Sequence, residues 1–300
     1  MNETIPRRRR RFDPTPWIMV LPALILYTAL VVFPLLLGGW ISLHQWDGLS
    51  DMVWSGLANY RYVFADSVFW QAMRNTFQYA IGVTIAKNVL GLALAVLLDA
   101  KLPGRTFFRG AAFIPVTLSF VVIGILWSWI FNPTFGLLNH GLQAIGLGGL
   151  VQGWLSNPRI ALWSVMAVDV WKWTGFHMVL FLAGLQTIPA ELYEAAQLDG
   201  AGRWRSFLHI TLPLLRPVIA FSTLLSLVGA FVANYDLVYV MTKGGPLHAT
   251  EVALTWIVST TFRFANVGKA DAMSMLLFAC VAVLGILQLL GMSRRDERSM

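Results

Sequence analysis

The chain has 300 residues, of which 57% are hydrophobic and 12% are charged. Because soluble domains carry about a quarter charged residues, this composition excludes a soluble globular protein and indicates a multi-pass membrane protein. The formal net charge of +7 could indicate binding to nucleic acid. No long polar segment is available to form a binding groove, however, and we expect no nucleic-acid partner. The single cysteine, Cys280, excludes an intrachain disulfide and a metal site built from cysteines.

Six apolar segments are long enough to cross the hydrocarbon core of a lipid bilayer, which takes about 20 residues of helix. The predicted fold class is all-α, a polytopic membrane protein with six transmembrane helices. In chain order, the predicted spans are residues 17–43, 76–98, 111–131, 161–185, 217–240 and 272–291. The first span follows five consecutive arginines, residues 7–11, and is too long for the apolar core of a signal peptide. We therefore interpret it as a retained start-transfer anchor.

Basic residues divide unequally between the two sides of this six-span arrangement. The loops of a membrane protein that hold most of its Lys and Arg usually face the cytoplasm. Six basic residues fall on one side, and fourteen fall on the other: residues 7–11, Lys101, Arg105, Arg109, Arg203, Arg205, Arg216, Arg294, Arg295 and Arg298. This bias predicts a basic cytoplasmic N-terminus over residues 1–16, a membrane domain over residues 17–291 and a cytoplasmic C-terminus over residues 292–300.

The fourth predicted span carries ionisable residues, which are costly in a membrane and usually face a cavity or one another. The spacing i, i+3, i+4, i+7 places four residues on one helical face: Asp169, Lys172, Trp173 and Phe176. Aromatic rings stack on the apolar face of a sugar ring while charged groups bond to its hydroxyls, so this face could line the path of a sugar-like solute. Alternatively, Asp169 and Lys172 form an ion pair within the helix that has only a structural role.

Two other spans also hold polar residues. In the fifth, the same spacing places Leu227, Phe231 and Asn234 on one face. In the second, Lys87 is either a side chain that snorkels to the membrane surface or the partner of a residue in another subunit. The histidines at positions 140, 177 and 248 lie far apart in the predicted topology, so we expect no metal site.

The loop over residues 188–213 is too polar to cross a membrane, yet its sequence predicts two short helices. Pro189 ends the preceding helix, and Glu191 and Glu194 follow in a first turn where carboxylates suit the helix dipole. Gly200 and Gly202 then separate this helix from a second, amphipathic one. Two short helices with a small-residue edge can dock into a groove of another protein. The alternative is a hairpin that lies on the lipid surface.

The residues of this loop resemble a specific motif. Glu194, Ala195 and Ala196 are followed after three residues by Gly200, and after nine more by Ile210, Leu212 and Pro213. The pattern resembles, without a departure, the EAA loop of permease subunits in binding-protein-dependent ABC importers. Nearly the whole chain resembles the carbohydrate-uptake branch, specifically its maltose-permease-like and glycerol-3-phosphate-permease-like subunit. Further family marks are residues 42–46, 56–60, 131–133, 136–139 and 242–246.

The resemblance implies an ABC importer type I permease fold. It implies a subunit that moves a sugar or sugar-like solute (an oligosaccharide, a monosaccharide or glycerol phosphate) inward by alternating access. It also implies that a separate ATPase seats the EAA loop in a cleft through Glu194, Ala195, Ala196, Asp199, Gly200, Ile210, Leu212 and Pro213. The chain has no G-x-x-x-x-G-K-[ST] phosphate loop. We therefore expect no catalytic residue and no cofactor on this chain, with ATP and magnesium on the ATPase.

The same resemblance implies partners and a location. The partners would be a second homologous permease subunit, two copies of a cytoplasmic ABC ATPase, an extracytoplasmic solute-binding protein and the lipid bilayer. The location would be the inner membrane of a bacterium or archaeon, with both termini in the cytoplasm. Solute contacts would map onto Asp169, Trp173, Phe176, Ala230, Phe231 and Asn234. Several of these residues are more charged or bulkier than in other members, which leaves the solute open.

Two rival functions are considered. An ion-coupled secondary carrier could use Asp169 and Lys172 as its coupling pair, as half of a pseudo-symmetric twelve-span protein, but it would not need an EAA loop. A membrane-embedded enzyme acting on lipid would need acids, bases or metal ligands clustered at the membrane surface, and the sequence has no such cluster.

Overall fold

The computed structural model describes residues 15–100, 103–232 and 234–296. Most of the predicted terminal segments, including the arginine run, lie outside the described residues. Within them the chain is mostly helical, and the two strands are β1 (His44–Gln45) and β2 (Val53–Trp54). Four helices are long and apolar enough to span a membrane, and the number rises to six if each of two bent helix pairs is counted as one span.

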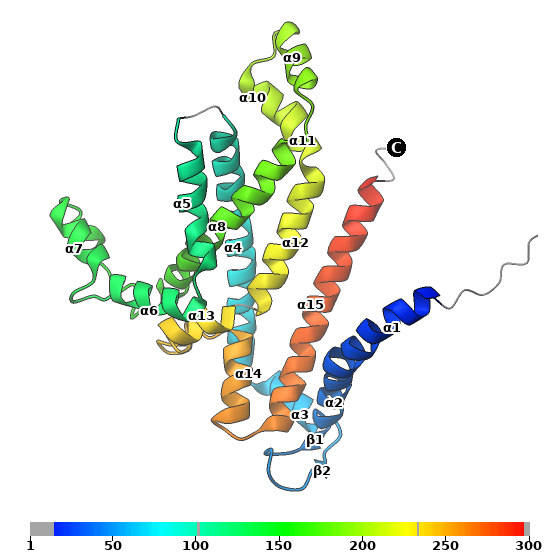
Figure 1. Cartoon of the computed structure of the whole chain (residues 1–300). Helices are drawn as coiled ribbons and strands as arrows, with labels where there is room; N and C mark the ends of the chain where they lie inside the picture. Colours follow the sequence, from blue (N-terminus) through cyan, green and yellow to red (C-terminus); the bar gives the residue numbers. More distant parts are fainter. Residues whose placement is uncertain (1–14, 101–102, 233, 297–300) are drawn as a thin grey trace, which may run out of the picture.

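The centre of the fold is a long helix, α4, packed along a second one, α8 (Figure 1). Helix α12 contacts both of them, and α15 packs against α12. The bounds are α4 (Ser67–Asp99), α8 (Ala161–Leu185), α12 (Arg216–Val232) and α15 (Val267–Asp296). Asp66 starts α4 because its carboxylate accepts the amides of Val68 and Phe69. Apolar side chains fill the space between these helices, and Tyr79, Val83, Val165 and Val168 are fully buried.

The first predicted span is observed at the edge of the molecule. It consists of α1 (Thr15–Tyr27), a π-helical turn (Thr28–Val32) and α2 (Phe33–Ile41). In Figure 1, α2 lies beside α15 and contacts it, while α1 runs outward from the rest of the molecule. Residues 19–41 have high hydropathy, and almost all of their side chains face outward. Such a surface is suited to lipid.

The third predicted span, residues 111–131, is wrong as one continuous helix. The chain forms α5 (Arg105–Thr117) and α6 (Phe120–Ile130), which meet at an angle of 102°. Pro115 near the end of α5 and Ser119, whose hydroxyl accepts the Val122 amide at 3.3 Å, favour a new helix start at this point. Both residues are visible in the sequence, but the continuous apolar segment around them led to the prediction of a single helix.

The fifth predicted span, residues 217–240, is covered by α12, which is described up to Val232, and by α13 (Asn234–Met241), which lies beside α6 (Figure 1). The fourth predicted span, residues 161–185, coincides with α8, whereas the second and sixth lie within longer helices: α4 begins nine residues earlier, at Ser67, and α15 begins five residues earlier, at Val267. In these two cases the helix extends beyond the apolar segment that predicted it.

The two ends of the molecule differ in structure, and we name them the hairpin end and the α9 end. The hairpin end holds the β1–β2 hairpin and two helices, α3 (Ala58–Ala65) and α14 (Ala253–Phe262). Its motif residue Asn59 donates to the carbonyls of Ser42 and His44, at 2.9 and 2.7 Å, and so ties α3 to the hairpin. In the exposed hairpin loop, amides of Ser50 and Leu49 and the Ser50 hydroxyl lower the pKa of Asp47 to about 2.

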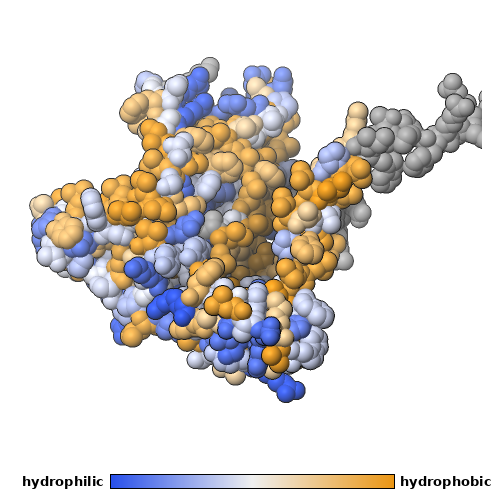
Figure 2. All heavy atoms as spheres, turned by 60° about the horizontal axis from the view of Figure 1, so that its bottom comes forward, coloured by the Kyte–Doolittle hydropathy of each residue, from blue (hydrophilic) through white to orange (hydrophobic). Residues whose placement is uncertain are grey.

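The α9 end carries the loop over residues 188–213. It contains α9 (Ala190–Leu198), α10 (Arg203–Ser206), a π-helical turn (Phe207–Thr211) and α11 (Leu212–Leu214). The helical segment Arg203–Leu214 meets α12 at an angle of 66°. Figure 2 shows hydrophobic residues over the middle of the visible face and hydrophilic residues gathered toward the ends. This banded surface matches a membrane protein whose ends meet water on both sides.

Candidate functional site

Helices α4, α8 and α12, together with the start of α13, enclose a cavity of about 290 Å³. Its polar lining residues are Tyr79, Lys87, Asp169, His177, Ser226 and Asn234. Its apolar lining includes Trp173, Phe176 and Leu225. The Trp173 and Phe176 rings meet nearly at a right angle, with their centroids 5.8 Å apart, so they form a corner of the wall. A space of this kind, mostly apolar with a few convergent polar groups, is typical of a small-molecule site.

A buried ion pair crosses the wall of this cavity. Lys87 Nζ of α4 lies 2.6 Å from Asp169 Oδ2 of α8, and each side chain is only 5% exposed. Lys87 therefore has a partner within its own chain, so neither sequence-based explanation of this residue is needed. The interpretation of Asp169 and Lys172 as an ion pair is wrong, because the carboxylate of Asp169 pairs with the neighbouring helix instead.

Lys172 points away from this ion pair, toward the end of α5. Its ammonium donates to the carbonyls of Pro115, Val116 and Leu118, at 3.3, 3.1 and 2.5 Å. It also lies 4.9 Å from the centre of the Phe120 ring. These carbonyls end α5 at the sharp bend, where the helix dipole is negative and a cation is favourable. Lys172 thus holds the α5–α6 bend against α8 and, contrary to the sequence-based prediction, does not line the cavity.

Of the seven predicted solute-path residues, five line this cavity: Asp169, Trp173, Phe176, Ala230 and Asn234. Like Lys172, Phe231 does not, because it packs edge to face on Phe77. Helical spacing does not separate Lys172 from the other three residues of its face; its hydrogen bonds to the end of α5 draw the ammonium away from the cavity. Whether these five residues contact a solute stays a prediction.

Sequence reasoning did not assign four of the polar lining residues: Tyr79, Lys87, His177 and Ser226. A signal was present, because Tyr79 and Lys87 lie eight residues apart on one face of α4, and Ser226, Ala230 and Asn234 follow at intervals of four. His177 Nδ1 lies 2.7 Å from the Ser222 hydroxyl, which joins α8 to α12 beside the cavity.

The loop over residues 188–213 has the two predicted helices. Pro189 precedes α9, Glu191 is in its first turn, and the helix ends at Leu198. Gly200 follows with φ +75°, and the Ala201 amide donates to the Ala196 carbonyl at 2.8 Å. Helix α9 therefore ends in a C-cap whose glycine has the left-handed conformation.

The predicted coupling residues of this loop are mostly accessible. Glu194, Ala195, Asp199 and Gly200 are exposed, and Ala196 is half-buried. Ile210, Leu212 and Pro213 are half-buried at the base of the loop. A hydrogen bond of 2.9 Å between the hydroxyls of Tyr193 and Thr211 ties α9 to that base. The tip of the loop therefore projects from the membrane helices as a firm, accessible surface.

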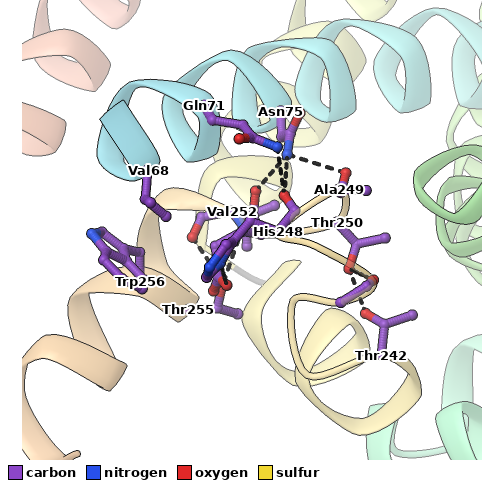
Figure 3. A network of polar contacts seen from close by, with 12 residues as sticks. Val68, Gln71, Asn75, Thr242, His248, Ala249, Thr250, Val252, Thr255 and Trp256 are labelled. Carbon is purple, nitrogen blue, oxygen red and sulfur yellow. Dashed lines mark hydrogen bonds and ion pairs between the residues drawn. The ribbon is translucent and has the colours of Figure 1, made fainter. Parts of the chain in front are cut away.

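The hairpin end has a rigid loop of its own, residues 242–252, with a polar network shown in Figure 3. The Asn75 amide donates to the carbonyls of His248, Ala249 and Glu251, at 3.3, 3.2 and 2.9 Å. His248 Nδ1 lies 2.9 Å from Glu251 Oε2. While these contacts fix the backbone, Leu247 at the tip is 86% exposed.

Residues 87–295 match the family described as binding-protein-dependent transport system inner membrane component. The chain is 37% identical to the probable ABC transporter permease protein YurN of Bacillus subtilis, over 91% of this chain and 94% of that protein. It is 35% identical to the lactose transport system permease protein LacF of Rhizobium radiobacter, over 93% and 94%. It is 33% identical to the trehalose/maltose transport system permease protein MalF of Thermococcus litoralis, over 98% and 99%.

The fold is similar to that of a chain in a crystal structure of a bacterial ABC transporter involved in the import of the acidic polysaccharide alginate. The TM-score is 0.81, with 23% sequence identity over 94% of this chain and 96% of that chain. This likeness shows the fold, which is that of an ABC importer permease, as predicted. The curated relatives are transport components rather than enzymes. With most of its length matched, the chain belongs to the family of inner membrane components of binding-protein-dependent transport systems.

Proposed function

We propose that this chain is the permease subunit of an ABC importer that moves a sugar or sugar-like solute inward by alternating access. The observation that carries the proposal is the cavity between α4, α8 and α12, where the Trp173 and Phe176 rings stand beside buried polar groups. Relatives named for lactose and for trehalose and maltose transport agree with this class of solute. Their names differ from one another, so they leave the individual solute open.

The loop over residues 188–213 is proposed as the coupling element. Its exposed helix α9 would seat in a separate ATPase, and a second permease would supply the matching loop for a second ATPase copy. ATP and magnesium would then bind to the ATPases, with no cofactor on this chain. The left-handed conformation at Gly200 and the hydrogen bond between Tyr193 and Thr211 support the proposal. They fix α9 to the base of the loop, next to α12, so that α9 and α12 would move together.

This assignment sets the orientation. The α9 end, and with it both chain termini, would face the cytoplasm. The described chain begins and ends away from the hairpin end, which agrees with termini on one side (Figure 1). The hairpin end would meet an extracytoplasmic solute-binding protein, and the rigid loop 242–252 with exposed Leu247 is the proposed contact. The rival secondary carrier is disfavoured, because its Asp169–Lys172 pair is not formed.

A charge reversal at the coupling loop tests the proposal. The variant Glu194→Lys should abolish copurification of the ATPase and solute-stimulated ATP hydrolysis while the protein still inserts into the membrane. Asp51→Lys places the same change in the exposed hairpin at the opposite end, and it should leave copurification of the ATPase intact. If the ATPase copurified normally with the Glu194→Lys variant, the loop would not be the coupling element.

A further inference from the structure

The cavity between α4, α8 and α12 contains charges but no net charge. Lys87 is the one Lys or Arg among its described lining residues, and Asp169 neutralises it at 2.6 Å. The nearby ammonium of Lys172 is directed away, onto the carbonyls that end α5. The described lining therefore offers no free cation that could pair with an anionic solute.

Several buried polar atoms of the same lining have no hydrogen-bond partner within the described part of the chain. They are the Ser226 hydroxyl and both amide atoms of Asn234. The two residues are 5% and 2% exposed. Buried polar groups are almost always paired in folded proteins, so groups left open at a cavity are available to bond to what the cavity holds.

The chemistry of these atoms restricts what the cavity can hold. The Ser226 hydroxyl both donates and accepts, and the Asn234 amide supplies two donors at nitrogen and an acceptor at oxygen. A carboxylate could satisfy only the donors, while a set of hydroxyl groups could satisfy all of them. The Trp173 and Phe176 rings provide an apolar corner for the flat face of a sugar ring.

We infer that the cavity selects an uncharged, hydroxyl-rich solute and disfavours sugars that carry a carboxylate, phosphate or sulfonate, with Asp169 as the residue that sets this preference. The inference rests on the proposed function, since it assigns the charge class of the solute at the same site. An anion beside Lys87 would face the Asp169 carboxylate at close range, where repulsion in a low-dielectric site is strong. Asp169 thereby neutralises Lys87, the one Lys or Arg of the described lining.

The test reads the charge of the cavity directly, with a cysteine reporter in the complete importer in proteoliposomes. In a Cys280→Ser background, Gly229→Cys places a thiol in the cavity wall at a position where an added Cβ meets no atom within 4 Å. Gly141→Cys, equally unobstructed but on the exposed helix α7 (Leu137–Ala144), is the matched control in water. The probes are positively and negatively charged methanethiosulfonates of similar size.

The ratio of the two modification rates at Gly229→Cys should match the ratio at the Gly141→Cys control. Adding Asp169→Asn should shift the ratio toward the negative reagent by about tenfold at Gly229→Cys only, because Lys87 loses its counter-charge. A parent cavity that already favours the negative reagent by that factor would overturn the inference. If Asp169→Asn yields no folded complex, the parent ratio alone decides.

Uptake by the same proteoliposomes supplies an independent measurement. Labelled maltose, lactose and trehalose are the neutral probes, and glucuronate and glucose 6-phosphate are the anionic ones. Uptake confined to neutral probes is expected, and uptake of either anionic probe at a rate comparable to the neutral ones would overturn the inference while leaving the importer assignment intact. Absence of any uptake would count against the proposed function, whereas the reagent ratio would still decide the charge of the cavity.

Discussion

The cavity and the loop over residues 188–213 show two different ways of holding functional residues. In the cavity, the position of a charged side chain depends on another helix, as that of Lys87 on α4 depends on Asp169 of α8. In the loop, the chain turns by contacts within a few residues, as at Gly200, and the coupling tip lies in the open. The comparison teaches that local sequence patterns predict the conformation of the loop, but predict only part of the side-chain pairing inside the membrane domain.

The largest expected effect comes from separating the buried pair. Lys87→Met or Asp169→Leu alone leaves an uncompensated charge inside the protein, which should destabilise the fold by about 3–5 kcal/mol. The double variant Lys87→Met/Asp169→Leu should recover most of the folded protein, since no charge then remains. The measurement is the amount and thermal stability of monodisperse protein in detergent.

A control distinguishes this pair from the one that the sequence suggested. Asp169→Ala/Lys172→Ala should not recover stability, because it leaves Lys87 unpaired and also removes the cation from the α5 carbonyls. Recovery in that variant, with none in Lys87→Met/Asp169→Leu, would contradict the observed pairing.

A smaller effect is expected where α5 touches α8. An added Cβ at Gly175 would overlap the backbone carbonyl of Ala112, so Gly175→Ala must push the two helices apart. Overpacking of this kind costs about 1–3 kcal/mol. Gly110→Ala on α5 itself meets no atom within 4 Å and should be neutral or slightly stabilising. Equal melting temperatures for the two variants would show that the helices are not in close contact.

The smallest effect on stability is expected in the coupling loop. Gly200 has φ +75°, so Gly200→Val should strain the corner by about 1–2 kcal/mol without changing the membrane helices. ATP hydrolysis stimulated by solute should fall, while the thermal stability of the membrane domain stays unchanged. Gly202→Ala is the matched control, because Gly202 has φ −72° and space for a Cβ. Full coupling in Gly200→Val would show that the corner's geometry is dispensable.

Much of the loop was predictable from its sequence. Pro189, Glu191 and Gly200 determine where α9 begins and ends, because a proline, a first-turn carboxylate and a glycine act within one turn of helix. The apolar segments likewise predicted helices in the right places. The division of the third segment at Leu118 was missed because hydropathy does not show where one helix ends and the next begins. The capping residue Ser119 marks the start of the new helix.

The sequence by itself determined that this protein is helical, membrane-embedded and equipped with an accessible loop of the EAA type. It also brought Asp169, Trp173 and Phe176 to one face, since helical spacing is a local property. Only the tertiary structure decided that Asp169 pairs with Lys87 and that Lys172 turns to α5. The physical reason is that the partner of a buried side chain depends on how each helix is rotated against its neighbours. That rotation is set by the packing of all their side chains together.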